Sequence, residues 1–330
     1  MRVAFFDAHK FERSVFERLN ETFRHELVFF EHRLNRDTVI VAKGFQVICS
    51  FVNDRLDRES LTWLKSNGIQ LVALRSAGFN HVDMLAARDL ALPIVRVPEY
   101  SPYAVAEHAV ALLSTLNRKI HRSYQRVREL NFSLEGLVGM DLHGKTVGVI
   151  GTGKIGSVFA RIMTGFGCKL LLHDQTPNQQ LAKELKATYV PLEALYSQSH
   201  IISLHVPLNP STRYLINQTS LSRMRKGVFL INTGRGALIH TKDLIQALKT
   251  GHLGGAGLDV YEEEEMVFFQ DHSDEILQDD VLARLLTFPN VIITSHQAFL
   301  TQEALENIAE TTLKNISDFE NGQPLQNRVN

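Results

Sequence analysis

The sequence has few cysteines and almost no net charge, and each shortage excludes a class of protein. Its 330 residues include two cysteines, Cys49 and Cys168, which lie in separate halves of the chain and in apolar surroundings. Two such residues provide neither a disulfide framework nor a metal-binding spacing, so we expect no metal site and a reducing, cytoplasmic location. A formal net charge of -1 gives no electrostatic footprint for nucleic acid or for an anionic membrane.

Long hydrophobic runs are also missing. The apolar stretch at the N-terminus, residues 3–6, is too short for a signal peptide, and no later run reaches the length of a membrane-spanning helix. Hydrophobic residues nevertheless make up 44 % of the chain and charged residues 22 %, which is the composition of a globular protein. At this length we expect two domains and a large core, without a membrane segment.

A glycine-rich turn between two apolar segments is the most informative feature that is present. The β-branched run 147–150 ends in Gly151, and Gly151, Gly153 and Gly156 form a Gly-x-Gly-x-x-Gly pattern. In a dinucleotide-binding fold, glycines at these positions permit a tight turn, close approach of a pyrophosphate, and tight packing of the next helix. That helix is expected to begin near Lys154, with its free N–H groups directed at the same place. The pattern predicts a diphosphate site.

The position of Asp174 favours NAD over NADP. This carboxylate follows the expected strand 169–173, about 20 residues beyond the glycines, where it can accept both hydroxyls of an adenosine ribose. It would repel a 2′-phosphate, and residues 175–177 contain no arginine to bind one. The alternative is a glycine-rich turn that only caps a core helix.

Short apolar segments alternate with helical patterns along the rest of the chain. In residues 1–100 the expected strands are 3–6, 47–51, 71–74 and 94–97. This alternation predicts an α/β domain with a parallel sheet covered on both faces. No glycine pattern follows its first strand, so this domain is expected to bind no dinucleotide of its own.

We expect the two domains to be interleaved along the chain. Proline residues at 98 and 102 and a long apolar helix mark a first crossing, and a helix from Thr301 returns the chain after the last strand. The prediction is a Rossmann NAD-binding domain, residues 101–297, inserted into a discontinuous flavodoxin-like substrate domain, residues 1–100 and 298–330. Both would be doubly wound parallel sheets.

Charged residues follow three strand patterns of the second domain. Arg235 follows 228–232, four glutamates at 262–265 follow 256–261, and His296 follows 291–294. Hydride transfer between nicotinamide and a 2-hydroxy acid needs a cation for the carboxylate, a general acid/base, and an anion that stabilises the imidazolium. Taken singly, the histidine fits a structural role and the glutamates fit a solvated loop. Only the combination indicates this chemistry.

Several motifs resemble the NAD-dependent D-2-hydroxyacid dehydrogenases, most of all the fermentative D-lactate dehydrogenases. These motifs cover the chain in order, at 151–156, 199–207, 231–236, 257–261 and 295–299. The resemblance implies that Arg235 anchors the substrate carboxylate, that His296 is the acid/base, and that Glu264 is the partner of this histidine. It further implies cofactor contacts from Lys154, Ile155, Asp174, Val206, Pro207, Thr212, Thr233, Gly234 and Asp259, beside the three glycines.

The same resemblance implies a substrate pocket in the first domain. Backbone N–H groups of Ala77 and Gly78 would bind the substrate, and Tyr100 and Phe299 would surround its side chain. From the residues alone, the turn at 75–80 is equally an ordinary strand-to-helix connection. Three positions differ from residues found in relatives: Thr212 stands where some relatives carry Asn, Gly234 replaces a more usual Ser, and His240 replaces an Asp. None of these changes removes a charge needed for the chemistry.

The resulting hypothesis is an NAD-dependent D-lactate dehydrogenase that reversibly reduces pyruvate, because two aromatic rings leave a small apolar space suited to a methyl group. One alternative is an enzyme for another or broader set of 2-oxo acids, since one methylene changes affinity by only about 1 to 3 kcal/mol. A nicotinamide-sensing, corepressor-like binding protein of the same fold is the other. Relatives imply a homodimer or homotetramer, with the apolar helix after Tyr103 as a candidate interface.

Overall fold

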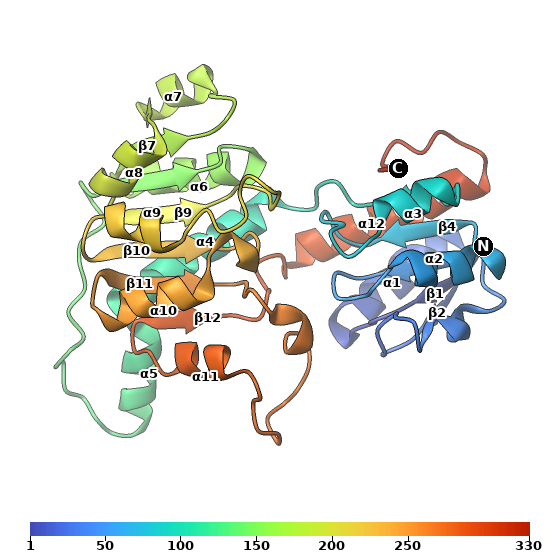
Figure 1. Ribbon diagram of the computed structural model, residues 1–330, viewed down its shortest axis with the longest axis horizontal. Helices are drawn as coiled ribbons and strands as arrows, with labels where there is room; N and C mark the ends of the chain where they lie inside the picture. The colour runs from blue at the N-terminus through green and yellow to red at the C-terminus, as the bar shows by residue number, and fades with distance from the viewer. The chain divides into compact units, whose positions relative to one another are not determined.

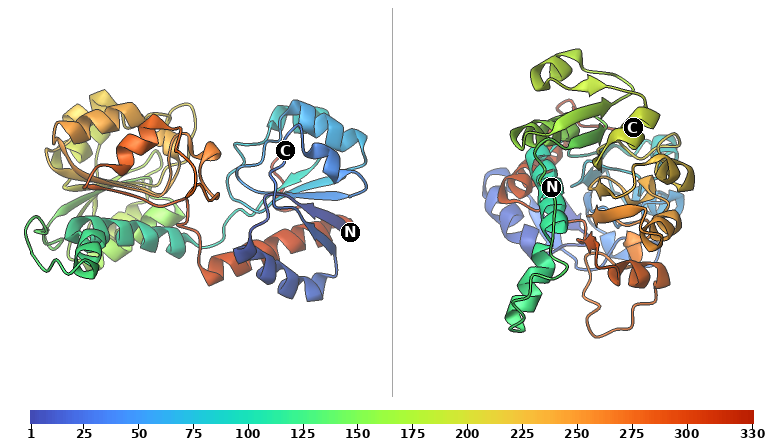
Figure 2. Two further views of the ribbon diagram at one scale, coloured as in Figure 1. Left: turned by 90° about the horizontal axis from the view of Figure 1, so that it is seen from below. Right: turned by 90° about the vertical axis from the view of Figure 1, so that its left-hand side faces the viewer.

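The chain forms two compact units, Met1–Ser101 with Phe299–Asn330, and Pro102–Ala298 (Figure 1). The computed structural model describes the backbone of all residues and the side chains of all except Met266. Each unit has a parallel sheet with helices on both faces, as Figure 2 shows. The α/β fold class expected from the sequence is therefore confirmed, and the two units are called the first and the second unit below.

The first unit contains a five-stranded parallel sheet in the order β2-β1-β3-β4-β5, which is the flavodoxin-like order. Apart from Arg2 at the start of β1, the residues of its central strands are buried and mostly apolar, as expected where helices cover both faces. The edge strand β2 was not predicted from the sequence. The elements are β1 (Arg2–Phe5), α1 (Lys10–Phe23), β2 (Glu26–Phe29), η1 (Val39–Ala42), β3 (Val47–Ser50), α2 (Arg58–Ser66), β4 (Leu71–Leu74), α3 (Met84–Asp89), β5 (Ile94–Val95) and α12 (Gln302–Glu320).

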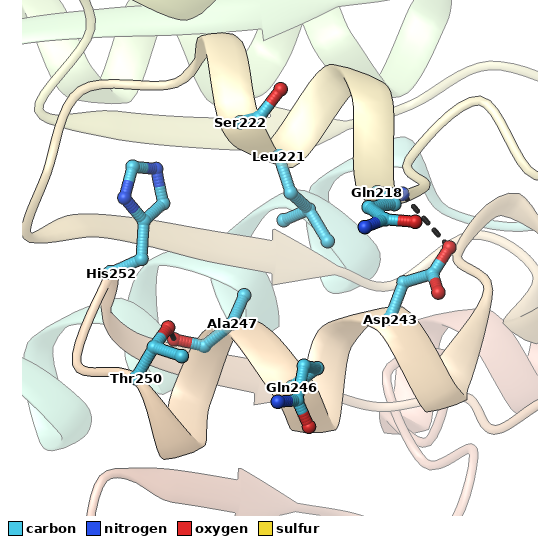
Figure 3. A pocket seen from close by; sticks show the side chains of 8 residues that line it. All are labelled: Gln218, Leu221, Ser222, Asp243, Gln246, Ala247, Thr250 and His252. Atoms are coloured by element: carbon cyan, nitrogen blue, oxygen red, sulfur yellow. Dashed lines mark hydrogen bonds between the residues drawn. The ribbon is translucent and has the colours of Figure 1, made fainter.

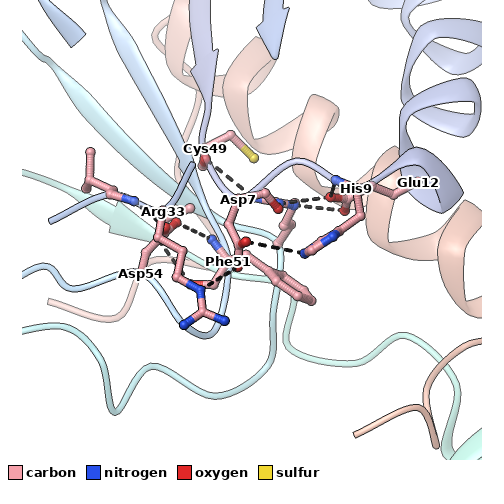
Figure 4. A network of polar contacts seen from close by, with 10 residues as sticks. Asp7, His9, Glu12, Arg33, Cys49, Phe51 and Asp54 are labelled. Carbon is pink, nitrogen blue, oxygen red and sulfur yellow. Dashed lines mark hydrogen bonds and ion pairs between the residues drawn. The ribbon is translucent and has the colours of Figure 1, made fainter. Parts of the chain in front are cut away.

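A buried polar network lies in this unit at the carboxyl end of β1 and β3 (Figure 4). Arg75 is fully buried and pairs with Glu12 through two hydrogen bonds, of 2.8 and 2.9 Å, and its Nη2 also donates to the carbonyl of Asp7. Asp54 accepts from the backbone N–H groups of Leu34 and Phe51. Burial raises the pKa of Asp54 to about 6.

The second unit contains a seven-stranded parallel sheet in the order β12-β11-β10-β9-β6-β7-β8. Strand order reverses between β6 and β9, which is the switch point at which dinucleotide-binding sheets hold their ligand. The strands are β6 (Thr146–Ile150), β7 (Lys169–His173), β8 (Thr188–Tyr189), β9 (Ile201–Leu204), β10 (Val228–Asn232), β11 (Leu253–Leu258) and β12 (Val291–Ile293). The helices are α4 (Pro102–Arg118), α5 (Ile120–Arg128), α6 (Lys154–Gly165), α7 (Gln179–Leu185), α8 (Leu192–Gln198), α9 (Gln218–Arg223), η2 (Gly236–Leu238), α10 (Thr241–Lys249), η3 (Glu264–Met266) and α11 (Asp280–Leu286).

None of the helices that the structure describes is both long and apolar enough to cross a membrane. No group of three or more His, Cys, Asp or Glu side chains is arranged to hold a metal ion among the residues whose side chains the structure describes.

Candidate active site

The glycine turn follows β6 directly and leads into α6, as the sequence predicts. Gly151 has a φ of +92°, and a Cβ atom there would lie 2.6 Å from the backbone of His205. A Cβ atom at Gly156 would lie 1.9 Å from the carbonyl oxygen of Gly151, so neither position accepts a side chain. A Cβ atom at Gly153, by contrast, would meet nothing within 4 Å. The turn therefore leaves open space at the N-terminus of α6, where a pyrophosphate fits.

Asp174 follows β7 and is held beside this turn. Its Oδ2 accepts hydrogen bonds from Thr152 N at 2.6 Å and Thr152 Oγ1 at 3.1 Å, and its Oδ1 accepts from Thr176 N at 2.9 Å. Partial burial alone would raise the pKa of Asp174, but these hydrogen bonds from Thr176 and Thr152 lower it below its ordinary value. The group is a fixed anion, which suits ribose hydroxyls and disfavours a 2′-phosphate.

The loop after β9 brings together Val206, Pro207 and Thr212. The Thr212 hydroxyl donates to the carbonyl of Pro207 at 2.6 Å and accepts from Asn209 N at 2.9 Å. The side chain is 8 % exposed. The hydroxyl thus shapes its own loop.

Arg235 follows β10 on a turn that the side chain of Asn232 holds. Asn232 accepts from Gly234 N at 3.0 Å and donates to the carbonyl of Arg235 at 2.9 Å. Nη1 of Arg235 donates to the carbonyl of Gly234, and no ion pair to a carboxylate engages this guanidinium within the described part of the chain. It remains available to a carboxylate ligand.

Thr233, in the same turn, points to a polar ligand. Its Oγ1 is buried and has no hydrogen-bond partner among the described residues. Buried hydroxyls are normally satisfied, so a polar group of a bound molecule would complete this site. Together with the open space at Gly153 and the anionic Asp174, this orphaned hydroxyl shows that the residues present fit a nicotinamide dinucleotide.

His296 forms an ion pair with one of the four consecutive glutamates. Its Nδ1 lies 2.7 Å from Oε1 of Glu264, and the other carboxylate oxygen accepts from Tyr261 N at 3.0 Å. Glu262 instead binds the Tyr214 hydroxyl and both the N–H and the hydroxyl of Thr241. Partner geometry therefore singles out Glu264, and Nε2 of His296 remains as the ring nitrogen that can exchange a proton with a substrate.

Asp259 holds the turn that presents His296. The resemblance implies that Asp259 lies near the nicotinamide. In the structure its carboxylate is fully buried and accepts from Thr294 Oγ1, Gln297 N and Ala298 N at 2.6–2.9 Å. Its carbonyl also accepts from His296 N at 2.7 Å. These bonds stabilise His296 at a φ of +53°, an uncommon conformation for a residue with a side chain.

The predicted substrate residues of the first unit are Ala77 and Gly78 after β4, Tyr100 after β5, and Phe299 after β12. The Gly78 carbonyl accepts from Ser76 Oγ, and the Ala77 carbonyl from Arg96 Nη1, so the turn is fixed through its carbonyl groups. Phe299 packs against Tyr100, with ring centroids 6.3 Å apart.

Sequence reasoning missed two further aromatic side chains around Phe299. Phe11 lies 6.3 Å and Phe51 lies 6.2 Å from its ring centroid. His9 stacks on Phe11 and also contacts Phe51. The signal for Phe51 was its place directly after a buried strand, at the ligand-binding edge of a parallel sheet; Phe11 offered none.

A separate pocket of about 400 Å³ lies between α9 and α10 (Figure 3). It is lined by Gln218, Leu221, Ser222, Asp243, Gln246, Ala247, Thr250 and His252. None of the predicted site residues is among them.

Comparison with known proteins agrees with this geometry. Residues 110–298 match the family described as D-isomer specific 2-hydroxyacid dehydrogenase, NAD binding domain. The chain is 51 % identical to a 2-hydroxyacid dehydrogenase homolog of Zymomonas mobilis, over 98 % of both chains. It is 48 % identical to the D-lactate dehydrogenase of Escherichia coli, over 100 % of both. The apo-structure of D-lactate dehydrogenase from Escherichia coli superimposes with a TM-score of 0.91 at 46 % identity, covering 100 % of each chain.

The matched region contains the glycine turn, Asp174, Arg235, Glu264 and His296. The similarity therefore includes the residues of the candidate site described above. With relatives near half identity over its whole length, the family is established. This chain belongs to the D-isomer specific 2-hydroxyacid dehydrogenases and carries their NAD-binding domain.

Proposed function

We propose that this protein is an NAD-dependent D-lactate dehydrogenase that reversibly reduces pyruvate to D-lactate. The observation that carries the proposal is the placement of three charges on one sheet. Arg235 follows β10, Glu264 follows β11 and His296 follows β12, and these three strands are neighbours. Their carboxyl ends lie along the edge at which such sheets bind ligands.

Each of these residues has a separate task in the proposed reaction. Arg235 binds the carboxylate of the 2-oxo acid. His296, protonated and paired with Glu264, donates a proton from Nε2 to the carbonyl oxygen, and in the oxidative direction the neutral ring takes that proton back. NADH, when bound, supplies the hydride that reduces the carbonyl carbon. Glu264 fixes the ring orientation and stabilises the imidazolium that precedes proton transfer.

The cofactor-binding residues are part of the same proposal. Gly151, Gly153, Lys154, Ile155 and Gly156 would hold the pyrophosphate, and Asp174 the adenosine ribose. The loop with Val206, Pro207 and Thr212 and the turn with Thr233 and Gly234 would continue toward the nicotinamide. Asp259 would act through the His296 turn that it holds.

The first unit supplies the proposed selectivity for a small substrate. Ala77 and Gly78 would offer backbone N–H groups, and Phe299 and Tyr100 would surround the methyl group of pyruvate. The crowding of Phe299 by Phe11 and Phe51 supports a small apolar pocket, because bulky rings fill the space that a longer side chain would need.

The decisive experiment measures NADH consumption with a panel of 2-oxo acids, followed by an enantiomer-specific assay of the product. Pyruvate as the best substrate, with D-lactate formed, is the expected result. A preference for a larger acid would keep the chemistry and overturn the pocket argument. Tight NADH binding without turnover of any acid would indicate a nicotinamide sensor.

Two variants test the residue roles. His296→Gln should lower turnover about 10² to 10⁴-fold, the usual share of general acid/base catalysis. Arg235→Ala should weaken pyruvate capture by about 2 to 5 kcal/mol, since it removes one partner of a desolvated charge pair. Arg223→Ala, which removes an exposed arginine of the same unit, is the matched control. If Arg235→Ala were saturated at the same pyruvate concentration as the wild type, the anchor role would be refuted.

A homo-oligomer, dimer or tetramer, completes the proposal. Apolar side chains are exposed in succession on α5 and the segment after it: Tyr124, Val127, Leu130, Phe132, Leu134 and Val138, from 47 to 83 %. Monomers rarely expose such a run, so a second copy of the chain is the proposed cover. Replacing Leu130 and Phe132 by Ser should release monomers in analytical ultracentrifugation.

We place this oligomer in the cytoplasm, where the free thiols of Cys49 and Cys168 would stay reduced.

A further inference from the structure

A second histidine, His108, lies behind the His296 turn and has no part in the reaction proposed above. Its Nε2 is 3.0 Å from Thr294 Oγ1 and 3.4 Å from Asp259 Oδ1, and its side chain is 18 % exposed. His108 belongs to α4, whereas Asp259 and Thr294 directly follow β11 and β12. Two chain segments more than a hundred residues apart thus meet at the base of the turn that carries the proposed acid/base.

Packing of α4 on β11 fixes this position. A Cβ atom at Gly255 would lie 3.2 Å from Leu116, and one at Gly257 would lie 3.2 Å from Leu112, so the glycines allow the helix to approach closely. Four residues of a helix span about 6 Å and two residues of a strand span about 6.6 Å, so every fourth residue of α4 lies beside every second residue of the β11 segment. The next pair in the same register is His108 with Asp259.

The hydrogen bonds of Thr294 show which ring nitrogen of His108 carries a hydrogen. Thr294 Oγ1 donates its single hydrogen to Asp259 Oδ1 at 2.6 Å, so it can only accept from the imidazole. Nε2 of His108 must therefore carry a hydrogen. His108, Thr294 and Asp259 form a directed chain of donors, and the Asp259 carboxylate at its end also binds the N–H groups of Gln297 and Ala298.

We infer that His108 is a positioning residue for His296. The chain of hydrogen bonds orients Asp259, and Asp259 fixes the left-handed backbone that aims the His296 ring. This inference rests on the proposed function of His296 as the acid/base. His108 itself has no part in the substrate or cofactor contacts proposed above, so its loss should disturb proton transfer without removing a ligand contact.

The test compares His108→Leu with His108→Gln. The leucine variant should lower kcat up to about 100-fold, the cost of misplacing a reacting group by about 1 Å, with the KM for NADH nearly unchanged. The primary isotope effect with deuterated NADH should rise as the chemical step becomes slower. The glutamine amide can donate from the same place, so His108→Gln should recover most of kcat.

His200→Leu is the matched control. His200 also binds a threonine, since its Nδ1 accepts from Thr146 N, but it precedes β9 and so lies at the opposite edge of the sheet. This variant should keep both kcat and the isotope effect. An unchanged kcat in His108→Leu, or a loss of NADH affinity shared equally by His108→Leu and His108→Gln, would overturn the inference.

A second measurement separates this inference from the proposed function. The imidazole ¹⁵N resonances of His296 report its ring environment whether or not pyruvate is turned over. They should shift in His108→Leu and stay in place in His200→Leu. If the wild-type protein is inactive but the resonances shift in His108→Leu, only the proposed function is refuted. If the wild-type protein is active and the resonances do not shift in His108→Leu, the positioning role of His108 is refuted.

Discussion

Nδ1 of His296 and Oε1 of Glu264 lie 2.7 Å apart, while the other oxygen of Glu264 is held by Tyr261 N. Both side chains are mostly buried, at 16 and 14 % exposure. The carboxylate is therefore fixed on one side by backbone and presents its second oxygen to the ring. This arrangement orients the imidazole and leaves Nε2 facing outward from the pair.

Replacing Glu264 by Gln should lower turnover about 10² to 10⁴-fold, because the amide keeps the size but not the charge that stabilises the imidazolium. Steady-state kinetics of NADH consumption with pyruvate measures this loss. Glu263→Gln is the control, since Glu263 is exposed and lies one residue away. Equal kinetics of the two variants would show that the charge on Glu264 is not used.

Replacing Asp174 by Ala should weaken NADH binding about 10 to 100-fold, the range for losing hydrogen bonds to a charged group. The same change removes the repulsion of a 2′-phosphate, so the ratio of KM values for NADPH and NADH should fall. Asp271→Asn provides a control, because Asp271 is also a hydrogen-bonded carboxylate, bound to Ser273 N in an exposed segment. An unchanged cofactor ratio in Asp174→Ala would exclude its role in discrimination.

His205 should make the second unit sensitive to acid. Burial lowers the pKa of His205 to about 3, against 6.5 when unfolded. Below pH 6.5 the unfolded chain therefore binds a proton that the native chain does not, and stability falls as the pH drops toward the native pKa. The contribution of this one residue is about 1.4 kcal/mol per pH unit.

His205→Gln should remove that contribution. The free energy of unfolding of this variant should therefore rise relative to that of the wild type as the pH is lowered. Urea unfolding followed by circular dichroism measures the difference. Tryptophan fluorescence would not report on His205, because the single tryptophan, Trp63, lies in the first unit and His205 lies in the second. His143→Gln, at an exposed position, should keep the wild-type slope. Parallel pH profiles of His205→Gln and the wild type would contradict the prediction.

Replacing Glu12 by Ala should destabilise the first unit by about 3 to 5 kcal/mol, since it leaves the fully buried guanidinium of Arg75 without its partner. Trp63 fluorescence during urea unfolding reports on this unit. Glu17→Ala removes an exposed ion pair with Arg13 on the same helix and should cost about 1 kcal/mol or less. A similar cost for both variants would mean that Arg75 finds another compensating group.

Local patterns were sufficient for the glycine turn and for the strands on either side of it. The strand–turn–helix–strand unit around Gly151 was predicted within one residue of the observed ends of β6 and β7, because glycine spacing and apolar periodicity act over neighbouring residues. By contrast, β2 lacks a buried apolar run, and its four residues are exposed or half-buried. A strand of that kind forms because β1 offers it an edge, which its own sequence does not reveal.

The sequence by itself determined the parallel α/β architecture, the glycine turn with Asp174, and the three strand ends that carry Arg235, His296 and the glutamates. The choice of Glu264 as the partner of His296 came from the resemblance to relatives and not from the residue pattern. Only the tertiary structure decided that these two side chains meet, that Asp259 holds the His296 turn, and that His108 and Phe51 join sites far from them in the chain. The physical reason is distance: backbone conformation and periodicity depend on adjacent residues, whereas hydrogen-bond partners are chosen by the packing of segments that are remote in sequence.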